Sequence, residues 1–120
     1  MDESILTSVK KTLGIAEDYE HFDPDLILHI NSVFMILQQL GVGPSEGFFI
    51  NDNTQTWANY LSDNKKLEAV KTYMCLKVRL LFDPPLSSAV MTAIEHMVGE
   101  LEWRLNVAAE QKEEEIQNGV

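Results

Sequence analysis

Two short stretches of the chain carry enough oxygen-bearing side chains to be considered as cation sites. The first stretch contains the carboxylates of Glu17, Asp18, Glu20, Asp23 and Asp25. The second contains the carboxylate of Asp52 and the amides of Asn51, Asn53 and Gln55. A calcium loop of the EF-hand type needs oxygen ligands at fixed intervals, a glycine at its sixth position and a bidentate glutamate at its twelfth. The first stretch contains no glycine, and the second lacks the terminal glutamate and is followed by Trp57. We therefore expect no metal site in either stretch.

Residues that could support acid–base or nucleophilic catalysis are present, but they are not spaced for it. The histidines, His21, His29 and His96, are far apart and form neither an HExxH pattern nor a cysteine-paired zinc pattern. Glu95 directly precedes His96, but adjacent helical residues point about 100° apart and make no dyad. The single cysteine, Cys75, lies in an apolar pattern, which raises the pKa of a thiol and favours an inert core residue.

One glycine-rich segment, GVGPSEG at residues 41–47, has the composition of a phosphate-binding loop. It lacks the lysine of that motif, and it follows a predicted helix where the motif requires a strand. The sequence therefore predicts no enzyme, no catalytic residues and no cofactor.

The chain is strongly acidic, with 19 acidic and 9 basic residues and a formal net charge of −10 at pH 7. Affinity for nucleic acids comes largely from lysines and arginines that neutralise phosphates. Here the basic residues are dispersed along the sequence without a run of five or six. We expect no specific nucleic-acid binding, although an acidic surface would suit a wall past which DNA slides without sticking.

The length of 120 residues predicts one domain. The first residues, MDESILTSVKK, do not form a secretory signal, and no apolar run approaches the roughly 18 residues of a membrane span. We expect a soluble cytosolic protein that does not associate with membranes.

The apolar spacing predicts an all-α fold, a small bundle of four to five helices with a long C-terminal helix. Ser4 as an N-cap and Gly14 as a terminator bound the first helix. Asp23 as a cap with Pro24 at the first helical position begins the second helix, which ends at Gly41.

Three further helices are expected after Gly41. A short helix is predicted over residues 54–61, and a helix over residues 64–82 is apolar on nearly its whole circumference, which requires burial at the centre of a bundle or against another copy. The last helix begins after Ser87 or Ser88 and keeps its apolar stripe to Val107. We therefore divide the chain into a helical domain, residues 1–107, and an acidic, flexible tail, residues 108–120.

The long loop after Gly41 carries three adjacent apolar residues, which either pair as a short strand or fold back onto the core. Large aromatic residues anchor both cores and interfaces. For Trp57 and Tyr60 both roles stay open, and packing is favoured for the apolar triplet. Trp103 lies off the main apolar stripe of the last helix, which favours contact with a neighbour. The candidate partner-contact residues are Phe48, Phe49, Ile50, Trp57, Tyr60 and Trp103.

Four segments in this order resemble the small helical head-tail connector (adaptor) proteins of tailed bacteriophages, of the siphophage kind, and of prophages. They are LTSVKKTLGI, DPDLILHINSVFMILQQLGVG, LEAVKTYMCLKVRLLFDPP and ELEWRLN, and the resemblance covers residues of about 4–107. It implies a structural virion protein whose copies form a ring beneath the portal, extend the DNA channel and offer a docking surface to a tail or stopper protein.

The resemblance also implies the partners and the location. The implied partners are other copies of the chain, the portal, and a tail or stopper protein. Before it joins the virion the chain is either a monomer in solution or already a ring. The virion is assembled in the cytoplasm of a bacterial host. Neighbour contacts would fall in residues 43–53 and 103–116. An alternative reading is an acidic helical adaptor or regulator that binds a basic protein partner, which the net charge and the segment QKEEE favour.

Overall fold

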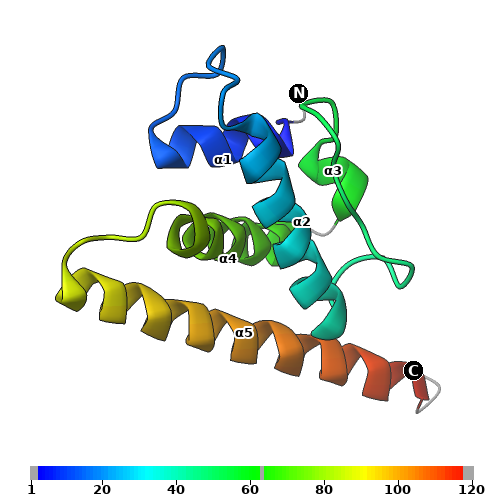
Figure 1. Ribbon diagram of the computed structural model, residues 1–120. Coiled ribbons are helices and arrows are strands. Elements are labelled where there is room, and N and C mark those ends of the chain that lie inside the picture. Colours follow the sequence, from blue (N-terminus) through cyan, green and yellow to red (C-terminus); the bar gives the residue numbers. More distant parts are fainter. Residues whose placement is uncertain (1–2, 63, 118–120) are drawn as a thin grey trace.

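The computed structural model describes residues 3–62 and 64–117. The described residues form five helices: α1 (Ile5–Leu13), α2 (Asp23–Gln39), α3 (Trp57–Tyr60), α4 (Asn64–Phe82) and α5 (Ser88–Gln117) (Figure 1). These residues contain no strand, and one isolated antiparallel bridge joins Ser4 to Thr56. The predicted all-α bundle is confirmed, and the apolar triplet in the long loop folds back without pairing as a strand.

Local signals set the ends of the helices. The backbone N–H of Thr7 donates to Oγ of Ser4 at 3.3 Å, and Gly14 ends α1 in the left-handed region at φ 76°. Thr56 and Asn59 form a reciprocal capping box that holds the single turn of α3. The short helix is therefore briefer than predicted, because the box places its start at Trp57.

The predicted cap of α2 is wrong by one residue. Phe22 occupies the N-cap position without a side-chain hydrogen bond, and Asp23 is the first helical residue. The carboxylate of Asp23 instead forms an ion pair with Lys10, whose Nζ lies 2.9 Å from Oδ1. Nζ of Lys10 also donates to the carbonyl oxygens of Glu17 and Tyr19 at 2.9 and 2.7 Å. Lys10 is only 2 % exposed, so one buried ammonium ties the connection between α1 and α2 to both helices.

α4 is the central helix of the bundle. It packs against α1, α2 and α5, and Val70, Tyr73, Met74 and Val78 are fully buried. The apolar circumference read from the sequence is therefore covered by the chain's own helices on three sides. Leu81, at the end of the predicted stripe, is 46 % exposed because α4 stops one residue later, before the Pro84–Pro85 turn.

α5 lies along one side of the bundle (Figure 1). Among its described side chains only Val98 and Leu105 are buried, and Ile94 and Leu101 pack partly against the core. The helix continues past Val107 without a break to Gln117. The division of the chain at residue 107 stays a prediction, and residues 118–120 of the predicted tail lie outside the described residues.

Candidate functional site

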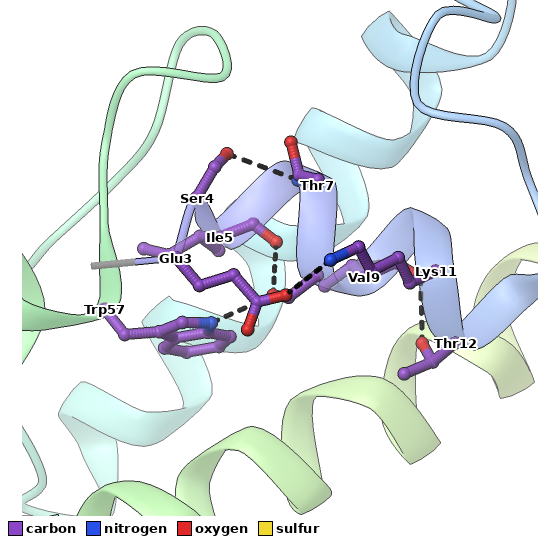
Figure 2. A network of polar contacts seen from close by, with 9 residues as sticks. Glu3, Ser4, Ile5, Thr7, Val9, Lys11, Thr12 and Trp57 are labelled. Atoms are coloured by element: carbon purple, nitrogen blue, oxygen red, sulfur yellow. Dashed lines mark hydrogen bonds and ion pairs between the residues drawn. The ribbon is translucent and has the colours of Figure 1, made fainter. Parts of the chain in front are cut away.

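Trp57 joins the start of the chain to the end of the long loop. Its indole Nε1–H donates to Oγ of Ser8 at 2.9 Å, and the side chain is only 2 % exposed (Figure 2). The backbone N–H of Ile5 donates to the carbonyl of Gln55 at 3.0 Å, and the N–H of Trp57 donates to the carbonyl of Glu3 at 3.3 Å. In this subunit Trp57 is a core residue that fixes α3 against α1.

Tyr60 lies in an aromatic cluster beneath the long loop. Its ring centroid is 4.7 Å from that of Phe34 and 5.3 Å from that of Phe48. Burial raises the pKa of the Tyr60 hydroxyl, which has no hydrogen-bond partner among the described residues. A Cβ atom on Gly43 would lie 2.6 Å from the Tyr60 ring, so the loop passes directly over it. Tyr60 too belongs to the core of the subunit.

The apolar triplet of the loop is fastened by Asn31 of α2. The side-chain amide of Asn31 donates to the carbonyl of Ile50 at 2.9 Å, and the N–H of Ile50 donates to Oδ1 of Asn31 at 2.7 Å. Ile50 is 1 % exposed, Phe48 is half-buried and Phe49 is 69 % exposed. This paired contact holds Asn31 half-buried under the loop.

Trp103 is the large aromatic residue that α5 leaves in solvent, with 68 % of its surface exposed. It borders a shallow hollow of about 390 Å³ formed by α5 alone, together with Glu95, His96, Gly99 and Glu100. A Cβ atom on Gly99 would meet nothing within 4 Å. The hollow is therefore open to solvent, and Trp103 is the large aromatic side chain that a partner could contact there.

The residues first considered for chemistry do not come together. The described part of the chain contains no group of three or more histidine, cysteine, aspartate or glutamate side chains that could hold a metal ion. Hydrogen bonds from the side chain and backbone of Thr54 lower the pKa of Asp52, so this carboxylate serves a local turn. Burial raises the pKa of the Cys75 thiol, which favours its inert form. No described helix is long and apolar enough to cross a membrane.

A protein-family model described as phage connector protein matches residues 5–112. The chain belongs to this family. No curated protein and no solved structure matches the connector. The family is structural, and it assigns the connector a role in joining phage head and tail and a place in the virion.

The connector presents two of its six candidate contact residues clearly to solvent. Phe49 and Trp103 are exposed, whereas Ile50, Trp57 and Tyr60 are almost fully buried in the subunit. These three buried residues could contact a partner only if the subunit opened. A role in the core, which the sequence left as an alternative for Trp57 and Tyr60 and favoured for Ile50, accounts for their positions. Contact with a partner stays a prediction for Phe49, Trp103 and half-buried Phe48.

Two further exposed residues were not predicted as contact residues. Leu28 and Met35 lie on α2 and are 65 % and 62 % exposed. They are seven positions apart, which places them on one face of the helix, two turns from each other. The signal was available, because both fall outside the main apolar stripe of α2, but an apolar residue off a stripe is common on protein surfaces.

Proposed function

We propose that the connector forms a ring beneath the portal, extends the DNA channel and offers a docking surface to a tail or stopper protein. The observation that carries the proposal is the family match over residues 5–112. The ring is assembled in the cytoplasm of the bacterial host and stays in the virion. In this role the connector acts by shape and contact, without catalytic residues or a cofactor.

Exposed apolar side chains support self-assembly. On α5 these are Val90, Met97 and Trp103, and on α2 and the loop they are Leu28, Met35 and Phe49. A closed ring of identical subunits needs two different surfaces that fit each other, one on each side of the subunit. Exposed apolar residues on different elements offer contact points for two such surfaces.

The charge of the connector supports a channel role. Each subunit has a formal net charge of −10, so a channel wall made of such subunits repels the phosphates of DNA. A ring of such subunits would let the packaged DNA pass without holding it.

The direct test is to mix the purified connector with portal rings of the same phage and to separate the complexes by sedimentation. We expect the connector to co-sediment with the portal and to appear as an added ring in electron micrographs. Light scattering over a concentration series tells whether the connector assembles alone or only on the portal. Failure to co-sediment at any concentration, with a folded connector, would count decisively against the proposal.

A second candidate function is an acidic adaptor that binds a basic protein. It is favoured by α5, which contains seven acidic and two basic residues. Such an adaptor would remain a monomer and would hold its partner through charge, so that moderate salt would release it. Assembly of several copies into a ring on the portal would exclude this function as the main one.

A further inference from the structure

The fold separates the charges of the connector, which the sequence leaves mixed. α1 and α4 together contain seven of the nine basic residues and a single acidic residue, Glu68. α1 packs against α4, so these basic residues lie on adjoining helices. α5 is the acidic counterpart. The basic residues are dispersed along the sequence, but most of them fall on two helices that pack together.

Not all of these basic residues are available to a partner. Lys10 is buried in its ion pair with Asp23, and Lys65 and Lys66 at the start of α4 have interactions of their own. Lys71 lies 3.8 Å from Glu68, with the carboxylate of Glu68 well exposed. The Lys71 side chain is 31 % exposed, and its Nζ also lies 6.0 Å from the centroid of the Trp57 ring. Partly exposed ion pairs contribute little, so a partner carboxylate can compete for Lys71.

A cavity of about 430 Å³ lies where the C-terminal end of α1 meets the middle of α4. Two of its lining side chains are cationic, Lys71 and Arg79. The others are the apolar side chains of Leu13 and Leu76, the thiol of Cys75, and the hydroxyl-bearing side chains of Thr12 and Thr72. Nε of Arg79 is shielded from solvent and has no hydrogen-bond partner among the described residues. The cavity therefore fits a segment that carries carboxylates beside an apolar side chain.

The C-terminal end of α5 has this chemistry. Residues 113–116 read Glu-Glu-Glu-Ile, and Ile116 is the only large apolar residue among residues 110–117. The C-terminus of a helix carries a partial negative charge, so three glutamates there are unfavourably placed until a cation approaches them. No basic residue occupies the last turn of α5.

This end of α5 cannot reach the cavity of its own subunit. α5 runs antiparallel to α4, and the hydroxyl of Tyr73 donates to Glu102, so the cavity beside the middle of α4 lies level with the middle of α5. Residues 113–116 follow Glu102 by 11–14 positions, so the continuous helix carries them about 16–21 Å beyond that level.

We infer that the cavity between α1 and α4 receives residues 113–116 of α5 from the neighbouring copy of the connector. The three carboxylates of this segment complement the charges of Lys71 and Arg79, and its one large apolar residue complements Leu13 and Leu76. Each copy then gives one acidic helix end and one basic cavity, the head-to-tail arrangement that closes a ring. The inference rests on the proposed ring and names the surfaces that join it. The charges fix orientation and partner choice, and the apolar contact adds affinity.

The single cysteine of the connector makes the contact directly testable. Cys75 lines the cavity, so an Ile116→Cys substitution places a second thiol on the segment that would enter it. A disulfide forms only when the two Cα atoms come within about 7 Å. Assembled Ile116→Cys connector, on portal rings if needed, is treated with a mild oxidant and run on a non-reducing gel. We expect a ladder of dimers, trimers and larger covalent products.

The control is the same variant carrying Cys75→Ser, which should give no ladder beyond a disulfide-linked dimer through the introduced thiol. Three outcomes with Ile116→Cys alone would overturn the inference. They are a cross-link within one chain, a product that stops at the dimer, and no cross-link at all. If the wild-type connector still assembles on the portal in that case, the proposed function stands and only the assigned surfaces fall. Failure of the wild type to assemble counts against both.

Charge reversal gives a second, independent measurement. Lys71→Glu should raise the concentration for half-maximal assembly about tenfold, and adding Glu113→Lys and Glu114→Lys in the same chain should restore it. Lys11→Glu makes the same change of charge at an exposed side chain of α1 that does not line the cavity, and should change assembly much less. Circular dichroism verifies that each variant folds. Equal effects of Lys71→Glu and Lys11→Glu would overturn the inference, and so would binding of short duplex DNA that is lost in Lys71→Glu.

Discussion

Gly43 is the residue at which the backbone tolerates a side chain least. Its φ of 84° lies in the left-handed region, and an added Cβ would meet three atoms of Tyr60 at 2.6–2.8 Å. We predict that Gly43→Ala lowers the free energy of unfolding by about 2 kcal/mol, from backbone strain and displacement of the tyrosine. Urea unfolding followed by circular dichroism measures the change.

Gly99→Ala is the matched control for that substitution. Gly99 lies inside α5 with nothing within 4 Å of an added Cβ, so alanine should raise the free energy of unfolding by up to about 1 kcal/mol. If the hollow beside Trp103 receives a partner, the same methyl group should weaken assembly while it strengthens the fold. Equal losses of stability at Gly43 and Gly99 would contradict the account of both sites.

Two buried tyrosines predict a loss of stability at alkaline pH. Burial raises the pKa of Tyr73 and of Tyr60, and the hydroxyl of Tyr73 also donates to Glu102 at 2.7 Å, next to its negative charge. In the unfolded chain both tyrosines have a pKa near 10. Above about pH 10 the unfolded state therefore loses protons that the folded state keeps, and stability falls as pH rises.

The measurement compares wild type with Tyr73→Phe in urea unfolding between about pH 8 and pH 11. The variant should be less stable at pH 8, because Glu102 loses its hydrogen-bond donor, and its stability should fall less steeply above pH 10. Tyr60, whose pKa burial also raises, is present in both proteins. Parallel curves for the two proteins would show that Tyr73 titrates normally in the folded state.

Some residue roles could not be predicted because they depend on contacts between distant segments. Lys10 looked like one of several dispersed surface lysines, yet its ammonium is buried against Asp23 and two loop carbonyls. Asn31 holds Ile50, which is 19 positions away. Neither partner lies at a helical or strand spacing, so no pattern in the sequence indicates the contact.

At the scale of elements the sequence was informative where caps and apolar spacing agree. The bounds predicted for α4, residues 64–82, are confirmed, because a double proline follows soon after its end and apolar residues surround it. α1 is likewise confirmed between Ser4 and Gly14. The long loop could not be predicted, since its path depends on Asn31 and on the aromatic cluster around Tyr60 rather than on local propensity.

The exposed face of α5 leads to a prediction that separates assembly from folding. Trp103→Ala removes a side chain that is 68 % exposed and introduces a better helix former, so the free energy of unfolding should change by less than about 0.5 kcal/mol. Binding to the portal or to other copies should weaken by about 2 kcal/mol or more, as expected for an aromatic anchor. Co-sedimentation with portal rings provides the measurement.

Trp57→Ala is the contrasting variant on α3. Trp57 is 2 % exposed and donates to Ser8, so its loss should lower the free energy of unfolding by about 3–5 kcal/mol. If Trp103→Ala destabilises the fold and leaves portal binding intact, the outer face of α5 is not a contact surface.

At the scale of the whole molecule, the segregation of charge is the property that the sequence hides most completely. The basic residues of α1 and α4 are separated by more than 50 positions along the chain, and they adjoin only because α1 packs on α4. The net charge alone does not show this arrangement. The fold instead gives an acidic helix along one side and a basic pair of helices elsewhere, so that subunits can attract one another despite a shared net charge of −10.

This polarity predicts the result of truncating the connector after Val107. The deletion removes four acidic residues and one basic residue but spares Leu105, the last buried apolar residue described on α5. We expect a folded monomer with nearly unchanged urea unfolding that no longer assembles, because the acidic helix end is missing. Replacing Glu113, Glu114 and Glu115 by glutamine keeps the length of the helix and should reproduce most of the loss, which assigns it to charge.

Wild-type assembly should accordingly weaken as salt is raised from about 0.05 to 0.5 M, where the screening length shortens to a few ångströms. If the truncated protein assembles as readily as the full chain, subunit contacts lie within residues 1–107 and the acidic end of α5 serves another purpose.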